Sequence, residues 1–463
     1  MNIEQKIDPI TNAAEGADAR FPVSIRAYAP SYLGTSFLLV FFSLLSFYLG
    51  YNIAAAVTLI FALTVIPFLR FTDKIVFDGR RLIRTGLVPR IWFRMHGMRS
   101  WVKLRNVEQV DTIVFGSFRR GHRVYFSYRT TIFGNGPAMV FAGGGRRYRK
   151  MIRALLPRFE THVLDCKSCE LSKYTAEPRA VRQNADRLKI PSADVLIGSV
   201  FQKLKRVQEN AEVPQNDKFE ELRLTANHLR FSGSLIRAVE AFRRALQIEP
   251  HNAWLLFEFS RCLHSISHVD RDPKLASRAA AALRLAERRA TGDTELLERI
   301  GETYRQFGFS RRAASAYQKA VEVIGECFRA LIGLAELALD DGKLAHVVHN
   351  FSAANRVAQN SALRRWTRSE ADYFSRLSED DEYMELEVSR LNLLDKLSRW
   401  KGTSFRLALY SAPLIFAGAI FNEPLVTNTG WLVSTAALIT WAAMNIGFKM
   451  LSPRIPYDLV EHD

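Results

Sequence analysis

The chain has 463 residues, which is long enough for several independently folding units. Its formal net charge is +17, and its mean hydropathy of −0.06 is close to that of a soluble protein. That average combines a polar middle with two long blocks near the ends that contain almost no charge. This distribution excludes an ordinary soluble globular protein, and only four cysteines argue against a disulfide framework.

The N-terminal part predicts a short tail followed by a membrane hairpin. Residues 1–29 are expected to be a cytosolic tail, because their charges are mixed and the apolar run starts too late for a signal peptide. Residues 27–69 contain no Asp, Glu, Lys or Arg, which is too long a stretch for one span of roughly 20 residues. The stretch divides at Gly50, so residues 30–69 are predicted to form a transmembrane helical hairpin.

Residues 70–159 carry 20 Lys or Arg and four acidic residues, which is nearly the whole positive excess of the chain. Residues 74–86 alternate around an Asp78-Gly79 turn, a strong hairpin signal. The following segments are rich in aromatic and β-branched residues and are predicted as strands: 90–98, 107–118, 122–130 and 136–143. Residues 146–159 are expected to close the domain as an amphipathic helix.

Two apolar helices, six or seven strands and one helix resemble the bacterial membrane-anchored pleckstrin-homology-like (PH-like) domains. FDGRRLIRTGL and WVKLRNVEQVDTIVF stand at the early strand positions of that family. The resemblance implies that residues 70–160 form a small β-barrel or sandwich capped by a helix. It also implies a location at the inner leaflet of the bacterial inner membrane.

The basic residues of this domain are candidates for binding anionic lipid headgroups, at about 1 kcal/mol per side chain near the surface. The candidates are Arg80, Arg81, Arg146, Arg147, Arg149 and Lys150. The plainer alternative is that the charge only reflects a position beside the membrane. Nucleic acid is not expected as a partner, because no recognised binding motif accompanies the charge.

Residues 161–218 are polar, contain three prolines and are expected to be a linker with one helix around 193–208. Cys166 and Cys169 have the spacing of a metal or redox pair, and His162 precedes them. A structural zinc site needs four ligands, and no second pair lies at the usual distance. We therefore predict no metal and no cofactor here.

Residues 219–361 contain units of 34 residues with small and aromatic residues at fixed positions. Ala226, Gly233 and Phe242 mark the first unit, and Gly301 and Tyr317 mark the third. A unit between them is longer by seven residues, which we place in the inter-helix loop around 264–273. The pattern resembles tetratricopeptide repeats, and this implies an α-solenoid of helix pairs.

The concave face of such a solenoid is a natural place to bind a partner. Its candidate residues are Trp254, Phe257, Arg261, Glu298, Glu302 and Arg305. The alternative for Trp254 and Phe257 is that they pack against capping loops.

The C-terminal part predicts capping helices in residues 362–402, with a break at Gly402, and a second transmembrane hairpin in residues 403–449. Residues 450–463 are expected to be a cytosolic tail. Lys and Arg are absent from both hairpin turns and present at the opposite helix ends, so both termini and residues 70–402 are expected in the cytosol.

The sequence therefore predicts a multidomain membrane protein with two transmembrane α-hairpins, a PH-like β-barrel or sandwich and a tetratricopeptide α-solenoid. We expect a membrane-anchored scaffold or adaptor, such as an accessory or assembly subunit, that binds another membrane-associated protein complex. The alternative is a regulator that responds to anionic lipid through its basic domain. No catalytic residues are expected, because no set of convergent polar residues is apparent.

Overall fold

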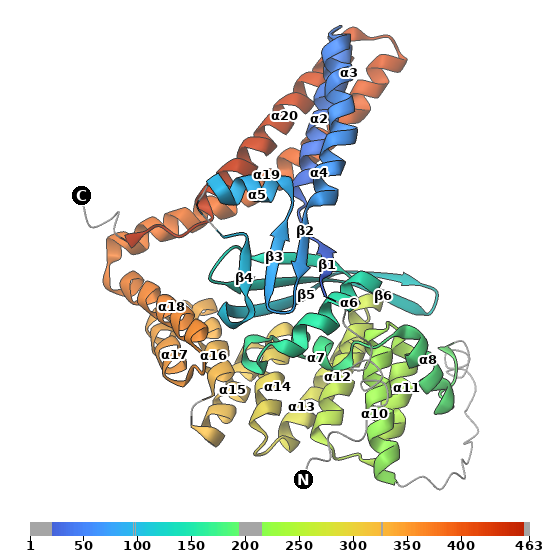
Figure 1. Ribbon diagram of the computed structural model, residues 1–463, viewed down its shortest axis with the longest axis vertical. Helices are drawn as coiled ribbons and strands as arrows, with labels where there is room; N and C mark the ends of the chain where they lie inside the picture. Colours follow the sequence, from blue (N-terminus) through green and yellow to red (C-terminus); the bar gives the residue numbers. More distant parts are fainter. Residues whose placement is uncertain (1–20, 96, 98, 194–214, 326, 458–463) are drawn as a thin grey trace. The chain divides into compact units, whose positions relative to one another are not determined.

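The computed structural model describes residues 21–193 and 215–457, apart from residues 96, 98 and 326 (Figure 1). The chain forms two compact units. The first comprises the segment that ends at residue 29 together with residues 71–371. The second comprises residues 30–70 and the chain from residue 372 onward.

A four-stranded antiparallel sheet opens the first unit, with the strands in sequence order. Its strands are β1 (Val23–Arg26), β2 (Lys74–Phe77), β3 (Arg81–Thr85) and β4 (Trp101–Lys103). The prediction that residues 1–29 are only a tail is wrong, because β1 pairs with β2. Val23 and Ile25 point inward and are buried, which is why this short segment joins the sheet. The hairpin segment is thus inserted between two paired strands.

A three-stranded antiparallel sheet follows, formed by β5 (Val107–Arg120), β6 (Arg123–Gly134) and β7 (Met139–Gly143). A bridge between Ala27 and Phe141 joins the two sheets. Both sheets and helix α6 (Arg146–Leu155) share one hydrophobic core, and we call them together the two-sheet domain. The predicted closing helix is confirmed, since Met151 and Leu155 are fully buried. Short 3-10 turns at Leu104–Asn106, Leu156–Arg158 and Thr161–Val163 link these elements.

Residues 90–98 were predicted as a strand, and this prediction is wrong. The structure has a helix instead, α5 (Leu87–Met95). Pro89 lies in its first turn, where a missing N–H costs nothing. Pro89 and Phe93 are four residues apart and are the two buried side chains of α5, so the segment follows helical and not strand periodicity.

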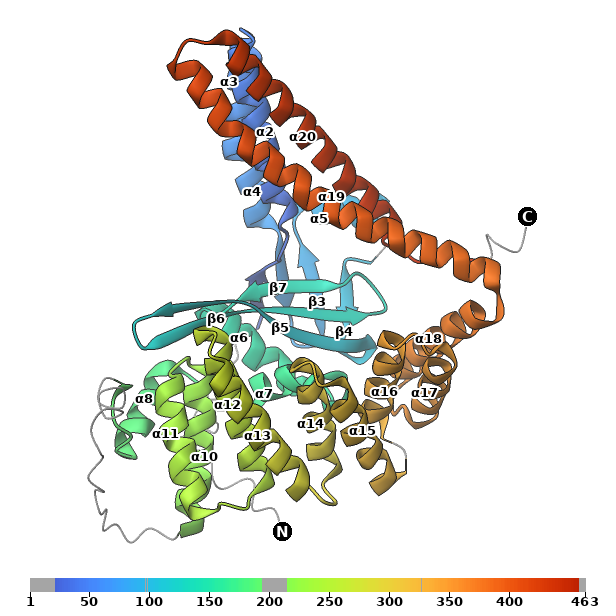
Figure 2. The ribbon, with the colours of Figure 1, turned by 180° about the vertical axis from the view of Figure 1, so that it is seen from behind.

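The middle of the chain forms a TPR-like stack of helix pairs (Figure 2). The pairs are α10 (Gln215–Phe231) with α11 (Leu235–Ile248), α12 (Ala253–Asp270) with α13 (Pro273–Arg289), α14 (Thr294–Gln306) with α15 (Ser310–Ile324), and α16 (Phe328–Asp340) with α17 (Leu344–Val357). The seven extra residues of the second unit lengthen its helices and do not form a loop, which corrects their predicted place. Helix α12 has 18 residues and α13 has 17, against 13 and 15 in the next pair. Ser267 in this extension is buried, so the added turn belongs to the packed part of the helix.

Small residues of the repeats lie where the helices approach most closely. The ring of Tyr317 packs between Gly301 and Gly333, and a Cβ atom at either glycine would lie within 2.6 Å of that ring. Gly233, in the turn after α10, accepts a hydrogen bond from the backbone N–H of Val124 in β6, at 3.0 Å. The repeats and the sheets therefore share direct backbone contact.

Residues 161–193 are not a free linker, which corrects the prediction for this segment. They form α7 (Cys166–Tyr174) and α8 (Pro178–Arg187). Val181 and Ala185 of α8 share a buried cluster with Phe219 and Leu222 of α10. The helix predicted around 193–208 lies almost wholly outside the described residues.

Among its described residues, the second unit contains four helices that are long and apolar enough to cross a membrane. They are α2 (Ser31–Tyr48), the helix Asn52–Thr72, α19 (Asp381–Ile420) and α20 (Pro424–Leu451). The helix Asn52–Thr72 consists of α3 (Asn52–Ile60), a π-helical turn (Phe61–Val65) and α4 (Ile66–Thr72). Gly418 and Gly430 allow close packing of α19 against α20.

Helix α18 (Ser361–Glu379) follows the repeats, and α19 then runs for 40 residues through Gly402. The break predicted at Gly402 is therefore wrong, and no boundary separates a capping helix from the second hairpin there. One glycine costs a helix only about 1 kcal/mol relative to alanine. The favourable residues on both sides outweigh that cost.

The packing of Tyr317 gives a test of the repeat core. Replacing Gly333 with alanine places a Cβ atom 2.4 Å from the Tyr317 ring, so we expect a loss of about 1–3 kcal/mol in stability. Thermal unfolding of the full chain in mild detergent measures the effect. Gly402→Ala is the matched control, because no atom lies within 4 Å of its Cβ position. A Gly333→Ala variant as stable as this control would contradict the close packing.

Candidate functional site: the concave face of the repeats

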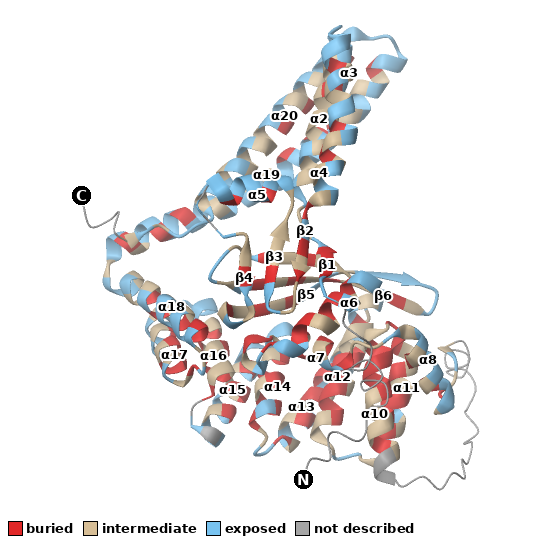
Figure 3. Cartoon of the chain, viewed as in Figure 1, coloured by how far each residue is buried: buried red, intermediate tan, exposed pale blue. Residues whose placement is uncertain are grey.

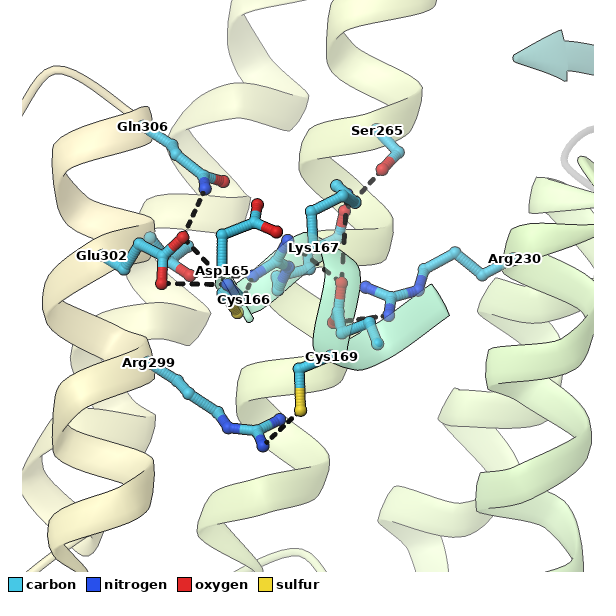
Figure 4. A network of polar contacts seen from close by, with 12 residues as sticks. Asp165, Cys166, Lys167, Cys169, Arg230, Ser265, Arg299, Glu302 and Gln306 are labelled. Atoms are coloured by element: carbon cyan, nitrogen blue, oxygen red, sulfur yellow. Dashed lines mark hydrogen bonds and ion pairs between the residues drawn. The ribbon is translucent and has the colours of Figure 1, made fainter. Parts of the chain in front are cut away.

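Helix α7 lies against the face formed by the first helices of the repeat pairs (Figure 4). Its residues contact α10 through Arg230, α12 through Arg261, and α14 through Arg299 and Glu302. The predicted partner-binding face is therefore occupied, over this part, by a segment of the same chain.

The N-terminus of α7 is held by two carboxylates. Asp165 caps the helix by accepting a hydrogen bond from the backbone N–H of Ser168, at 2.8 Å. The backbone N–H of Cys166 donates to both carboxylate oxygens of Glu302, at 3.0 and 3.1 Å. The partial positive charge of a helix N-terminus favours such groups. Burial, together with the nearby Glu302 and Asp111, nevertheless raises the pKa of Asp165 to about 7.

The carboxylate of Glu170 lies at the centre of the network. It forms ion pairs with Arg230 at 2.6 Å and with Arg261 at 3.0 Å. The exposed fractions of the three residues are 1%, 3% and 4%, so the charges are withdrawn from water. Burial alone would raise the pKa of Glu170, but Arg230, Arg261 and Lys167 outweigh it and lower that pKa to about 2. Burial and the adjacent Arg261 in turn lower the pKa of Lys167 to about 8.

The two cysteines of α7 face arginines of the repeats. Arg261 donates to the Sγ atom of Cys166 at 2.6 Å, and Arg299 donates to that of Cys169 at 3.1 Å. Burial raises the pKa of Cys166 to about 12, so this sulfur is a protonated thiol at neutral pH. Among the described residues, no group of three or more His, Cys, Asp or Glu side chains is placed to hold a metal ion.

The opposite side of α7 is bonded to the sheets. The hydroxyl of Ser168 lies 2.7 Å from that of Thr112 on β5, and Thr112 continues the chain of hydroxyls to Thr130 on β6 at 3.0 Å. Thr130 contacts the hydroxyl of Tyr148 on α6 at 2.7 Å. Helix α7 therefore joins the two-sheet domain to the repeat stack by polar contacts on both sides.

The first three predicted partner-binding residues are engaged within the chain. Phe257 and Arg261 are buried. Trp254 is half-buried, and its indole N–H donates to the Oδ2 atom of Asp293 at 2.6 Å. Trp254 and Phe257 therefore pack within the chain, in a cluster that includes residues of α7 and α14.

The other three residues, Glu298, Glu302 and Arg305, line a cavity of about 80 Å³ beside β5 and α16. This volume is several times that needed by one water molecule. Its lining has six carboxyl side chains, Glu108, Asp111, Asp165, Glu298, Glu302 and Glu336, against two arginines, Arg305 and Arg329. Burial raises the pKa values of Glu298 and Glu336. A positively charged group would complement this lining.

The predicted lipid-binding residues fall into two separate groups. Arg80 lies in the β2–β3 turn and Arg81 begins β3; Arg158, just after the end of α6, contacts this turn at the carbonyl of Gly79. The others lie in the first five residues of α6, a helix of 10 residues that is about 15 Å long. They are Arg146, Arg147 and Lys150, which are exposed, and Arg149, which is half-buried and donates to the carbonyl of Gly144.

No protein-family model and no curated protein sequence matches this chain. Among solved structures, a crystal structure of MamA is 18% identical over 29% of this chain and 75% of that chain, with a TM-score of 0.25. PilF of Pseudomonas aeruginosa is 16% identical over 50% of this chain and 99% of that chain, with a TM-score of 0.29. The APC/C hetero-tetramer Cut9–Hcn1 is 13% identical over 62% of this chain and 49% of that chain, with a TM-score of 0.29. Similarities at these TM-scores carry no argument about function.

The Glu170 network predicts a large effect from a small change. Glu170→Gln removes the charge that neutralises Arg230 and Arg261, and breaking a buried pair in this way costs about 3–5 kcal/mol. We expect a lower thermal midpoint and faster thiol labelling of Cys166 and Cys169, which are buried in the native protein. Glu322→Gln, at an exposed position of α15, is the control. Equal stability and labelling in both variants would contradict the role of Glu170.

The raised pKa of Asp165 predicts that the stability of the protein depends on pH. Its folded pKa is raised from 3.8 to about 7, so its contribution to stability is present below pH 3.8 and is lost as the pH rises through 7. Asp165→Asn keeps the helix cap and removes the charge. We expect the variant to be more stable than wild type at pH 8, by roughly 1 kcal/mol or more.

That advantage of Asp165→Asn should shrink towards zero as the pH falls to 3.8. Thermal midpoints measured across this pH range give the difference between variant and wild type. Asp340→Asn, at the exposed end of α16, carries the same chemical change and is the control. A pH-independent difference for Asp165→Asn would refute the raised pKa.

Proposed function

We propose that this protein is a membrane-anchored scaffold that binds another membrane-associated protein complex through its repeats, as an accessory or assembly subunit. In this proposal the four apolar helices span the bacterial inner membrane. Both termini and the first unit lie in the cytosol, as the distribution of Lys and Arg favours.

The observation that carries the proposal is the junction made by α7. Polar contacts of α7 with β5 on one side and with α10, α12 and α14 on the other join the repeats to the two-sheet domain. The chain passes from that domain into the first apolar hairpin between the paired strands β1 and β2. A repeat stack joined in this way to the domain that carries the hairpin supports a scaffold, because a partner bound to the repeats is linked through that domain to the anchor.

The part of the concave face that α7 leaves open is the proposed partner site. Glu298, Glu302 and Arg305 border the cavity there, and carboxylates outnumber cations around it. A Lys or Arg side chain of the partner would supply the missing positive charge. Specificity would come from the desolvated charges, since removing one partner of such a pair is costly.

A lipid-responsive regulator is the second proposal, favoured by the exposed basic side chains of the two-sheet domain. Arg80 and Arg81 lie near one end of α6, whereas Arg146, Arg147 and Lys150 lie at its other end. Because the basic side chains form two separate groups, they favour attraction to an anionic surface at several points and not binding of one headgroup in a single pocket. Tight, headgroup-specific binding by residues 70–160 would favour the regulator, whereas an affinity that only scales with vesicle charge and falls with salt would leave anchoring alone.

Affinity purification in mild detergent, followed by mass spectrometry, tests the scaffold. We expect a stoichiometric partner with wild type, and roughly tenfold lower recovery with Glu298→Gln/Glu336→Gln, because the substitutions remove two cavity charges. Glu322→Gln/Asp340→Asn is the control with two exposed charges removed.

Absence of any stoichiometric partner from the wild-type purification would count against the scaffold itself. Full recovery with the cavity variant would contradict only the placement of the binding site.

A further inference from the structure

The four-stranded sheet brings three points of the chain to one of its ends. Arg26 at the end of β1 is paired with Lys74 at the start of β2, and Lys74 is paired with Thr85 at the end of β3. The chain enters the apolar hairpin after β1 and returns from it at β2. The end of β3 therefore lies beside the two points where the hairpin segment begins and ends.

Helix α5 starts at this end of the sheet. Gly86, the residue before it, has φ +140°, and a Cβ atom there would lie 3.0 Å from the Cα atom of Asp73. Asp73 directly follows α4, and its buried carboxylate is held by Arg84 at 2.8 and 3.0 Å. The start of α5 is thus fixed against the first residue after the hairpin helix.

The surface of α5 is divided into three faces. Pro89 and Phe93 form the buried face. Arg90 and Arg94, also four residues apart, form an exposed basic face. The remaining side chains form an exposed apolar face, in which Ile91 is 59% exposed and Met95 is 75% exposed. Its members are Leu87, Val88, Ile91, Trp92 and Met95. Figure 3 shows most of α5 in the colour of exposed residues.

This arrangement is unusual for a helix that faces water. Five large apolar side chains gather on nine residues, and a contiguous exposed apolar patch marks an interaction site. No acidic residue occurs between Asp78 and Glu108, so the charged residues that flank α5 in the sequence are all basic. An apolar face next to arginines, with a tryptophan among its members, is the composition of a helix that lies in a membrane interface.

We propose that α5 is an interfacial helix that lies on the bilayer surface. Its apolar face enters the acyl-chain boundary, and Arg90 and Arg94 extend to the phosphates of anionic phospholipids. The inference rests on the membrane anchoring proposed above. It assigns lipid contact to residues other than Arg80 and Arg81, which lie at the opposite end of β2 and β3. It also gives the two-sheet domain a fixed face towards the membrane.

Fluorescence quenching on the full chain in phosphatidylglycerol-containing vesicles tests the proposal. Single cysteines replace Ile91 on α5, Val57 on the hairpin helix and Glu322 on the repeats, and each carries an environment-sensitive dye. The cysteines of the described chain are buried, which limits background labelling. Doxyl-labelled lipids should reduce dye emission at positions 57 and 91 by roughly twofold or more and leave position 322 unchanged.

The three positions separate failure of the anchor from failure of α5. Quenching at 57 without quenching at 91 would overturn the interfacial helix and leave the anchor standing. Absence of quenching at 57 would overturn the anchor, on which the inference rests.

Arg90→Gln/Arg94→Gln, combined with the dye at 91, tests the basic face. We expect this variant to lose at least half of the quenching at position 91, with roughly unchanged quenching at 57. Undiminished quenching at 91 would overturn the role assigned to the two arginines.

Discussion

The carboxylate of Glu170 sits between two buried arginines that belong to different helices of the repeat stack, Arg230 on α10 and Arg261 on α12. Without it, the two buried guanidinium groups would lose the carboxylate that both of them contact, and removing one partner of a buried ion pair is strongly destabilising. The repeats supply the positive charges and α7 supplies the negative one. Helix α7 therefore links the two-sheet domain to the repeats, because its Ser168 is also part of the chain of hydroxyl contacts that ends at Tyr148.

This use of the concave face changes how the repeat stack relates to partners. A face that commonly receives a foreign peptide is here filled, over α10, α12 and α14, by a helix of the same chain. What stays open is the acidic cavity beside α16, where carboxylates outnumber cations. Any partner that enters there meets a preorganised site, since the positions of Glu302 and Asp165 are already set by the N-terminus of α7.

The second constraint is the pairing of β1 with β2 across the apolar hairpin. A segment of more than 40 residues leaves and re-enters the sheet at neighbouring positions, Arg26 and Lys74. The anchor is thereby tied to the folded domain at two points, and α5 starts beside the same end through Gly86 and Asp73. Helix α5 presents exposed apolar and basic side chains at this end of the sheet, and both kinds of side chain suit the membrane contact proposed for it.

The sequence by itself determined the elements whose signals are local: the apolar helices, the strands around Asp78-Gly79, helix α6 and the helix pairs of the repeats. It did not reveal α7, because this short polar helix is stabilised by Arg230 and Arg261, which lie 60 or more residues away. It also misassigned residues 90–98, since aromatic composition favours a strand while the burial of Pro89 and Phe93 requires a helix. Of the six predicted concave-face residues, the tertiary structure alone decided that Phe257 and Arg261 are used internally and that Glu298, Glu302 and Arg305 border a cavity. Periodicity specifies which side chains share a face, but burial energy and charge pairing between distant segments decide what that face contacts.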